Sequence, residues 1–352
     1  MENKVKKFNN YKEINRHYNA FWENEYLERC CLYLKTKCDN PYIPQNAEQK
    51  WADLDFRCKQ VAYMKENTEF FAEGFPHVIT DFGPGSLAEF VGGSYKWADD
   101  TVWYDEAQYI TDFENLPKIE LNKNSDIFTT AMDYTNRIMD MGIVPSVPDI
   151  GGITDVIAAL RGTNDLLFDL YDYPDEMMDL NEKLRPMWLE SFNCFSAAVI
   201  KKTGYTTSWM PVLSDKPYYP VQCDFSAMIS PEMFDKFIMP ELRYITENIP
   251  RSIYHLDGVD AIRHLDSILK IESLNAIQWV PGAGNPDAGD EQWFELYHKI
   301  QSAGKGLVLY GIEPEALENV VKKLSPKGLF VSTHYCEDKK HAAELIECAV
   351  KR

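Results

Sequence analysis

The chain has 352 residues, of which 45% are hydrophobic, enough to fill the core of one large α/β domain or of two smaller ones. Its 36 Lys and Arg residues stand against 55 Asp and Glu residues, and the formal net charge of −19 disfavours nucleic acid and anionic membranes as partners. No apolar stretch approaches the roughly 18 residues of a membrane-spanning helix and the N-terminus is charged, so we expect a cytoplasmic protein without a signal peptide.

Residues 1–70 are predicted to form an N-terminal helical extension. Aromatic and leucine residues recur with helical spacing over residues 18–34, and residues 48–71 continue that pattern after a break that contains two prolines. The extension either covers one end of the domain formed by residues 71–352 or mediates self-association, for example as a homodimer.

The first clear strand covers residues 77–81. The Gly-Pro-Gly sequence at residues 83–85 prevents its continuation and leaves Asp81 at the mouth of a loop. Residues 92–121 are rich in Trp, Tyr and Asp and have no regular period, which is typical of a wall or lid beside a site. Helical spacing over residues 125–141 then leads to a second strand at residues 143–149, although its prolines fit poorly in a central strand.

Gly151 and Gly152 turn the chain into an apolar helix at residues 153–160. One or two long helices follow over residues 166–200, with a break near Pro174. Residues 206–210 and 221–226 are both strand candidates, but too few residues separate them for a crossover helix, so one of them is expected to be a loop.

The C-terminal part of the chain alternates regularly between helix and strand. Four strands, each preceded by an amphipathic helix, are predicted at residues 252–256, 276–280, 306–310 and 328–332. With the earlier strands, the count favours a (β/α)8 TIM barrel, whose active sites lie at the C-terminal ends of the strands. A doubly wound sheet is the alternative, and the lack of a Gly-x-Gly-x-x-Gly motif makes a dinucleotide fold less favoured.

The strand at residues 252–256 delivers His255 and Asp257 to the expected site. Side chains at positions i and i+2 of a strand lie on one face, so both can reach the same atom while Leu256 packs the other way. The alternative is that His255 bonds to its neighbour and Asp257 caps the helix that follows.

The other strand ends supply further candidates. His255 and Asp257, with His334 or Cys336, could provide three ligands for zinc. Without a metal, His255 and Asp257 would instead form a general acid/base pair. Asp224, Gln278 and the aromatic Trp209, Tyr254, Trp279 and Tyr335 are expected to bind substrate. Arginine and lysine are scarce there, which favours an apolar, aromatic or cationic small molecule.

Several short motifs, in this order, resemble those of the uroporphyrinogen decarboxylase superfamily over residues 75–350. They are Val-Ile-Thr-Asp ending at Asp81, Asp-Ile-Gly-Gly at residues 149–152, Cys-Asp-Phe-Ser at residues 223–226, His-Leu-Asp-Gly at residues 255–258 and Val-Ser-Thr-His ending at His334. The resemblance implies the barrel fold. It also implies that Asp81 corresponds to the catalytic aspartate of the decarboxylases, and His334 to a histidine near their C-terminus.

Within this superfamily the chain is more similar to the cobalamin-linked methyltransferases than to the decarboxylases. The decarboxylases carry an N-terminal arginine-bearing segment that grips substrate carboxylates, and residues 1–75 contain nothing similar. The methyltransferases bind zinc through a His-x-Cys pair and a late cysteine. In this chain His255 matches the histidine, Asp257 replaces the first cysteine, and His334, close to Cys336, replaces the second.

The resulting hypothesis is a zinc-assisted methyltransferase that moves a methyl group between a small methylated compound and a corrinoid protein or a thiol. In it Asp81, His255, Asp257 and His334 are catalytic, and Asp81 and Asp224 position the substrate. Two alternatives stay open: a cofactor-free decarboxylase that uses Asp81, and a non-catalytic barrel that binds a corrinoid or another small molecule.

Overall fold

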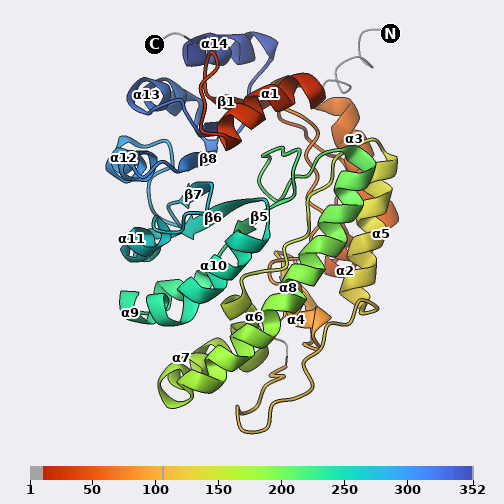
Figure 1. Ribbon diagram of the computed structural model, residues 1–352. Coiled ribbons are helices and arrows are strands. Elements are labelled where there is room, and N and C mark those ends of the chain that lie inside the picture. Colours follow the sequence, from red (N-terminus) through yellow and green to blue (C-terminus); the bar gives the residue numbers. More distant parts are fainter. Residues whose placement is uncertain (1–10, 105–106, 351–352) are drawn as a thin grey trace.

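The computed structural model describes residues 11–104 and 107–350. Its central feature is a seven-stranded, mostly parallel sheet with the strand order β2-β1-β9-β8-β7-β6-β5 (Figure 1). The strands are β1 (Cys31–Lys35), β2 (Phe70–Ala72), β5 (Tyr218–Val221), β6 (Arg251–Asp257), β7 (Ala276–Val280), β8 (Gly306–Ile312) and β9 (Leu329–Thr333). A separate two-stranded sheet pairs β3 (Lys96–Trp97) with β4 (Val102–Trp103). The fold is therefore of the α/β class.

Helices surround the sheet, with α10 to α14 in series beside strands β5 to β9 (Figure 1). The helices of the described residues are α1 (Tyr11–Trp22), α2 (Ala47–Trp51), α3 (Leu54–Asn67), α4 (Leu87–Phe90), α5 (Asp126–Asp140), α6 (Ile153–Arg161), α7 (Thr163–Asp172), α8 (Pro174–Thr203), α9 (Pro231–Met233), α10 (Met239–Asn248), α11 (Leu265–Ile268), α12 (Phe294–Ser302), α13 (Leu317–Lys323) and α14 (Lys339–Val350). None of these helices is long and apolar enough to cross a membrane.

The alternation predicted for the C-terminal part is confirmed. Strands β6 to β9 pair in parallel with their sequence neighbours, because the helix between each pair returns the chain to the same end of the sheet. The break expected near Pro174 is also present, since Pro174 begins α8 and Tyr173 leaves the helical conformation just before it.

The closed barrel expected from the strand count does not appear in the hydrogen-bonded pairing of the described residues. The strands predicted near residues 78, 145 and 207 are reduced to isolated parallel bridges, Val78 with Pro145 and Ser146 with Thr207. The prolines at 145 and 148 have no N–H to donate, which limits a longer ladder there. The partner of β9 is β1, where a closed barrel would have residues 77–81.

Residues 1–10 lie outside the described residues. For the rest of residues 1–70, the helical prediction is correct for α1, α2 and α3 and wrong for β1 and for the start of β2. The run Cys31–Lys35 is buried over its first four residues, and it pairs in parallel with β9 and antiparallel with β2. A short apolar run has no period that distinguishes a buried strand from a helix. The helical pattern predicted from residue 18 onward therefore wrongly includes residues 31–34. The division of the chain into two domains at residue 70 stays a prediction.

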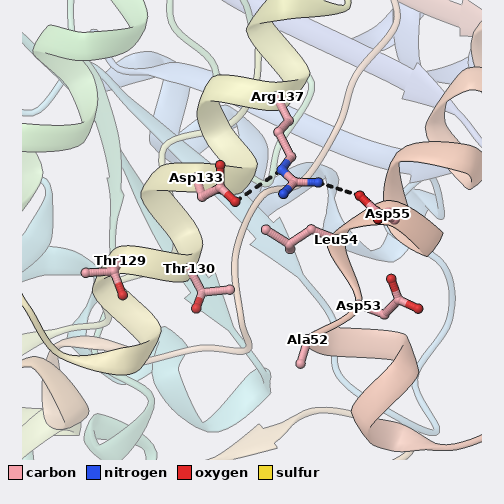
Figure 2. A pocket seen from close by; sticks show the side chains of 8 residues that line it. All are labelled: Ala52, Asp53, Leu54, Asp55, Thr129, Thr130, Asp133 and Arg137. Atoms are coloured by element: carbon pink, nitrogen blue, oxygen red, sulfur yellow. Dashed lines mark hydrogen bonds and ion pairs between the residues drawn. The ribbon is translucent and has the colours of Figure 1, made fainter.

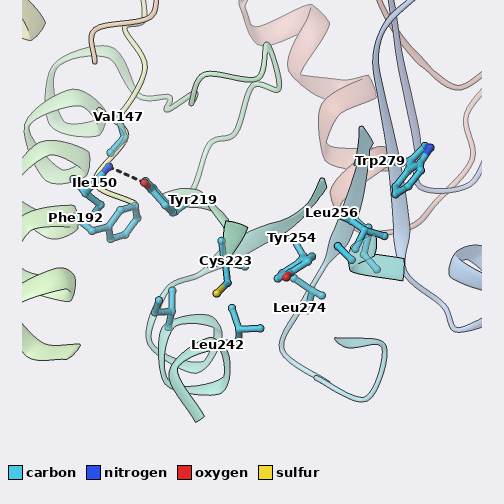
Figure 3. Close-up of a cluster of buried hydrophobic side chains, with 14 of the residues drawn as sticks. Val147, Ile150, Phe192, Tyr219, Cys223, Leu242, Tyr254, Leu256, Leu274 and Trp279 are labelled. Carbon is cyan, nitrogen blue, oxygen red and sulfur yellow. Dashed lines mark hydrogen bonds between the residues drawn. The ribbon is translucent and has the colours of Figure 1, made fainter. Parts of the chain in front are cut away.

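Two hydrophobic clusters lie on opposite sides of the β6 strand. Tyr254 and Leu256 belong to the larger one, together with Cys223 and Trp279, and Figure 3 labels these four side chains. Ile253 belongs to the smaller cluster, which also includes Tyr18 of α1. Since side chains alternate along a strand, His255 continues the side of Ile253 and faces away from the larger core.

Helix α1 packs on the smaller cluster at the N-terminal ends of the strands. The Trp22 indole N–H donates to the Leu213 carbonyl at 2.9 Å, and the Tyr18 hydroxyl donates to the Pro211 carbonyl at 3.1 Å. Arg251, the first residue of β6, pairs with Glu23 at 3.0 Å. Helix α1 therefore closes the end of the sheet that lies opposite His255 and Asp257.

Candidate active site

The candidate site is built by the C-terminal ends of β5, β6 and β7. Parallel pairing places His255 of β6 directly beside Gln278 of β7. Val221, the last residue of β5, lies beside Tyr254, and the short helix Asp224–Met228 starts three residues after it. The register thus brings Asp224 to the same end of the sheet as His255 and Asp257.

Asp224, His255 and Asp257 form a compact cluster of potential metal ligands. One ligand atom from each residue lies within 4.8 Å of those of the other two. The His255 Nε2 atom is 4.0 Å from the Asp257 carboxylate, and His255 Nδ1 is 2.8 Å from Gln278 Oε1. When Gln278 Oε1 accepts a hydrogen bond from Nδ1, the Nε2 lone pair is left free to bind a ligand.

The donor set fits a divalent cation. One imidazole nitrogen and two carboxylates suit zinc, and a second hydrogen bond that orients the imidazole is the usual feature of a metal-binding histidine. Desolvation raises the pKa of the Asp224 carboxyl, and the negative charge of Asp257 raises it too, while His255 acts in the opposite direction. A bound cation would offset the repulsion between the two carboxylates.

The structure groups the predicted ligands differently from the sequence analysis. Asp224, assigned there to substrate binding, lies with His255 and Asp257, whereas His334 and Cys336 belong to no group of three metal-binding side chains among the described residues. His334 is half-exposed and lies 3.8 Å from Glu313. Cys336 is buried, and its backbone N–H donates to the Lys35 carbonyl at 2.8 Å, which fixes the strand end beside β1.

The aromatic residues predicted to bind substrate divide into three groups. Trp209 lies against the His255 ring, with 4.9 Å between ring centroids, and its buried indole N–H has no hydrogen-bond partner among the described residues. Tyr254 is only 1% exposed and belongs to the larger core, because it occupies the opposite face of β6 from His255. Tyr335 is exposed at 45%, with the Lys35 ammonium 5.5 Å from its ring.

Trp279 also occupies the core, yet it lines a pocket of about 420 Å³ that includes Asp257 and Tyr310. Its ring packs edge to face on Trp293, with centroids 5.1 Å apart, and no described residue accepts a bond from its buried N–H. Asp257 therefore borders open space on one side of the ligand cluster.

A larger pocket, of about 490 Å³, includes Asp224 among its lining residues. Trp103 and Tyr104 form part of its wall, so the segment at residues 92–121 lines this pocket, although β3 and β4 give part of the segment a regular structure that was not predicted. Asp155 of α6 also lines this pocket, and its carboxylate accepts hydrogen bonds from the backbone N–H groups of Asp224 and Phe225 at 3.1 and 2.9 Å.

Asp155 positions the Asp224 segment and is not among the site residues predicted from the sequence. Burial raises the pKa of Asp155 to about 8, and the negative charge of Asp224 contributes. The sequence does contain a signal for this contact, since Gly151 and Gly152 immediately precede α6. A Cβ atom at Gly152 would overlap the Gln222 carbonyl oxygen, so only glycine lets α6 approach the segment that carries Asp224.

Asp81 and Asp149 lie at the ends of the two irregular strands. The Asp81 backbone carbonyl accepts a hydrogen bond from Arg57 at 3.2 Å, and burial raises the pKa of its carboxyl group. Burial and the nearby negative charge of Asp81 raise the pKa of Asp149 to about 7, although its carboxylate accepts bonds from the Tyr219 hydroxyl and the Gly151 N–H. Neither belongs to the ligand cluster.

A third pocket, of about 460 Å³, lies between α3 and α5, away from these residues (Figure 2). Arg137 is the one cation among its described lining residues, and it is paired with Asp55 at 2.6 Å and with Asp133 at 3.1 Å. Because both carboxylates engage the Arg137 guanidinium, the described residues of this pocket offer no free positive group to an anion. The pocket contributes nothing to the candidate site.

Comparisons with known proteins give a likeness of fold. No protein-family profile matches the chain, and no curated protein matches its sequence. A solved structure described as a methyltransferase from Methanosarcina mazei is similar, with a TM-score of 0.59 and 10% sequence identity over 96% of this chain and 98% of that one. At this level of identity the likeness concerns the fold, and it extends over nearly the whole of both chains.

Proposed function

We propose that the protein is a metal-assisted methyltransferase of the uroporphyrinogen decarboxylase superfamily. The observation that carries the proposal is the cluster of Asp224, His255 and Asp257 at the C-terminal ends of parallel strands, which is where α/β enzymes of this kind place their active sites. The fold likeness to a methyltransferase directs the choice of reaction. We also propose that the fold is a (β/α)8 barrel, to which both the seven-stranded sheet and the bridges at residues 78, 145 and 207 belong.

The proposed metal is zinc, held by Asp224, His255 and Asp257. When bound, zinc would supply Lewis acidity, which lowers the pKa of a thiol nucleophile. Gln278 keeps the His255 ring in the orientation and tautomer that present Nε2 to the cation. The Trp209 ring packs edge to face with the imidazole and supports its orientation.

The proposed reaction moves a methyl group between a small methylated compound and a corrinoid protein or a thiol. Asp224 lines one pocket and Asp257 lines another, so the two pockets offer separate places for the donor and the acceptor beside the cluster. A corrinoid protein is the proposed partner, and the homodimer and the cytoplasmic location stay predictions.

The decarboxylase alternative receives less support from the site. A substrate with several carboxylates needs paired cations, since each unpaired buried charge costs several kcal/mol. The described residues that line the pocket beside Asp224 include no Lys or Arg. That pocket is therefore poorly suited to uroporphyrinogen.

The test is the metal content of the purified protein, measured by elemental analysis in parallel with methyl transfer from methylcobalamin to a thiol. We expect about one zinc per chain, as a single three-residue site implies, and loss of both the metal and the activity in His255→Ala. His334→Ala is the matched control, because this histidine lies outside the cluster and its loss should leave the zinc in place. Equal zinc content in the wild-type protein and His255→Ala would refute the proposed ligand set.

A further inference from the structure

Lys35, the last residue of β1, lies on the same face of the sheet as His255. Cys31 and Tyr33 of β1 belong to the smaller hydrophobic cluster, which also includes Ile253 of β6. Because side chains alternate along a strand, Lys35 and His255 both continue the side of this cluster. A partly buried ammonium group therefore lies at the C-terminal end of the sheet, as the candidate site does.

The Lys35 ammonium group has no carboxylate partner among the described residues. It lies 5.5 Å from the centre of the Tyr335 ring, and within residues 11–104 and 107–350 no side chain forms an ion pair or hydrogen bond with it. Burial lowers the pKa of Lys35, and only the Cys38 thiol acts in the opposite direction. An unpaired and partly desolvated ammonium group is stabilised by an anion that binds beside it.

Two tyrosine hydroxyl groups near Lys35 are also free to donate. Tyr310 of β8 and Tyr335 are 37% and 45% exposed, and neither hydroxyl has a hydrogen-bond partner in the described part of the chain. Burial raises the pKa of Tyr310, and the nearby Tyr335 contributes. The register of β8, β9 and β1 places Tyr310 level with Tyr33, two residues before Lys35. One ammonium and two hydroxyl groups therefore offer donors to one anion.

The pocket of about 420 Å³ beside Asp257 extends to these donors. Tyr310 lines it together with Asp257, and Trp279, Pro281 and Ala288 supply apolar wall. Its volume is in the range that encloses a small molecule. The pocket therefore borders the proposed metal site through Asp257 and the donors around Lys35 through Tyr310.

His77 connects the surroundings of Lys35 with those of His255. The His77 Nε2 atom lies 2.6 Å from the Ser208 carbonyl oxygen, and the next residue, Trp209, packs on the His255 ring. Burial lowers the pKa of His77 to about 4, and the positive charge of Lys35 lowers it too. At neutral pH the His77 ring is therefore uncharged, and Lys35 is the cation on this side of the site.

We propose that Lys35, with the hydroxyl groups of Tyr310 and Tyr335, binds the carboxylate of a small organic acid whose other end lies in the pocket beside Asp257. A monocarboxylate fits best, because the described residues that line the pocket include no Lys, Arg or His for a second negative charge. The inference rests on the proposed function for one point, that this acid is the methyl donor. Binding of the carboxylate needs only Lys35 and its neighbours.

The test is calorimetric titration of the full-length protein with benzoate and with benzamide, its neutral analogue of nearly the same shape. An aromatic ring is chosen because Trp279 and Tyr310 line the pocket. We expect benzoate to bind at least about tenfold more tightly, because only the carboxylate pairs with the ammonium group. Equal affinities would overturn the inference. Displacement of benzoate by inorganic phosphate at equal concentration would overturn the choice of a carboxylate.

Variants of Lys35 assign the binding to this residue. We expect Lys35→Met to weaken benzoate binding about tenfold and to leave benzamide binding unchanged, which also shows that the variant is folded. Lys35→Arg keeps the charge and should retain most of the affinity. Lys37→Met is the matched control, because Lys37 is exposed and pairs with Asp39 at 3.0 Å. Unchanged benzoate binding in Lys35→Met would contradict the assignment.

His255→Ala separates binding at Lys35 from binding to a metal. Lys35 lies outside the ligand cluster, so this variant should still prefer benzoate to benzamide. Loss of the preference in His255→Ala, with its retention in Lys35→Met, would place the carboxylate on the metal and overturn the inference.

The two proposals fail in different ways. Preference for benzoate in a protein that holds no zinc and transfers no methyl group would remove the proposed function and leave the carboxylate site. Zinc binding and methyl transfer by a protein that binds benzoate no better than benzamide would remove the carboxylate site and leave the proposed function.

Discussion

At the scale of single residues, the site depends on the pairing of His255 with Gln278. The amide oxygen of Gln278 lies 2.8 Å from Nδ1, and this contact decides which imidazole nitrogen faces Asp224 and Asp257. Two residues next to each other in the parallel register therefore prepare one nitrogen for binding. Gln278 is not a ligand itself, and it acts by positioning His255.

Replacing Gln278 should weaken metal binding without removing it. We expect Gln278→Leu to lower zinc affinity by about 10- to 100-fold, because the imidazole loses the partner that fixes its tautomer. Gln278→Glu keeps an acceptor oxygen and should retain the affinity. Competition with a chromogenic chelator measures both variants, and equal affinity of Gln278→Leu and the wild-type protein would contradict a positioning role.

At the scale of elements, strand alternation and one close helix approach create the site. Alternation along β6 sends Tyr254 and Leu256 into the core and His255 and Asp257 to the site. The N-terminus of α6 approaches residues 222–225 closely enough for Asp155 to accept two of their backbone N–H groups. That contact places Asp224 beside His255.

The close approach makes Gly152 sensitive to a single added methyl group. Its φ of −74° is open to any residue, so Gly152→Ala acts through overlap of the added methyl group with the Gln222 carbonyl oxygen and with the Asp155 carboxylate. We expect a loss of about 1–3 kcal/mol in the free energy of unfolding and reduced zinc content, because the Asp224 segment is displaced.

Gly204→Ala provides the comparison for Gly152→Ala. Gly204 ends α8 with a φ of +79° and has open space where a Cβ would be, so alanine there should cost about 1 kcal/mol in backbone conformation. Zinc content should stay at the wild-type level. If both variants lose zinc to the same extent, general destabilisation and not the α6 contact explains the loss.

At the scale of the whole molecule, α1 and the site occupy opposite ends of the sheet. The smaller hydrophobic cluster runs from Tyr18 of α1 to Ile253, and Trp209 packs on it beside His255. The N-terminal segment thus contributes both a helix that closes one end and the strand β1 beside β9. Of the two roles considered for the extension, covering one end of the sheet is the one that these contacts support.

Buried carboxyl groups and the formal net charge of −19 make the stability of the whole molecule dependent on pH. Asp149 has a pKa of about 7 in the folded protein, against an ordinary value of 3.8. Between these values the folded state holds a proton on Asp149 that the unfolded state has lost, so the contribution of Asp149 to stability falls as the pH rises and becomes constant above about 7.

Asp149→Asn should remove this dependence. The amide oxygen can still accept from the Tyr219 hydroxyl and the Gly151 N–H, and no charge is buried. We expect equal stability of the two proteins near pH 4 and an advantage of the variant of up to about 4 kcal/mol above pH 7. Urea unfolding as a function of pH measures the difference, and parallel curves for the two proteins would contradict the raised pKa.

The sequence by itself determined the features that depend on local periods. Helix and strand alternation over the C-terminal part, the break before Pro174, and the exit of His255 and Asp257 on one face of β6 all follow from spacing within a few residues. The sequence also predicts a wall at residues 92–121, and Trp103 does line a pocket, but the pairing of β3 with β4 within this segment was not predicted.

Only the tertiary structure decided which of these residues meet. Asp224 joins His255 and Asp257 because β5 pairs with β6 and Asp155 holds the backbone of residues 224–225. His334 and Cys336 follow β9, which lies three positions from β6 in the sheet order. The helix predicted for the residues of β1 is wrong because a short apolar run fits a buried helix and a buried strand equally well. Pairing with β9 is what makes it a strand. Contacts between residues distant in sequence depend on pairing partners, and no local pattern encodes them.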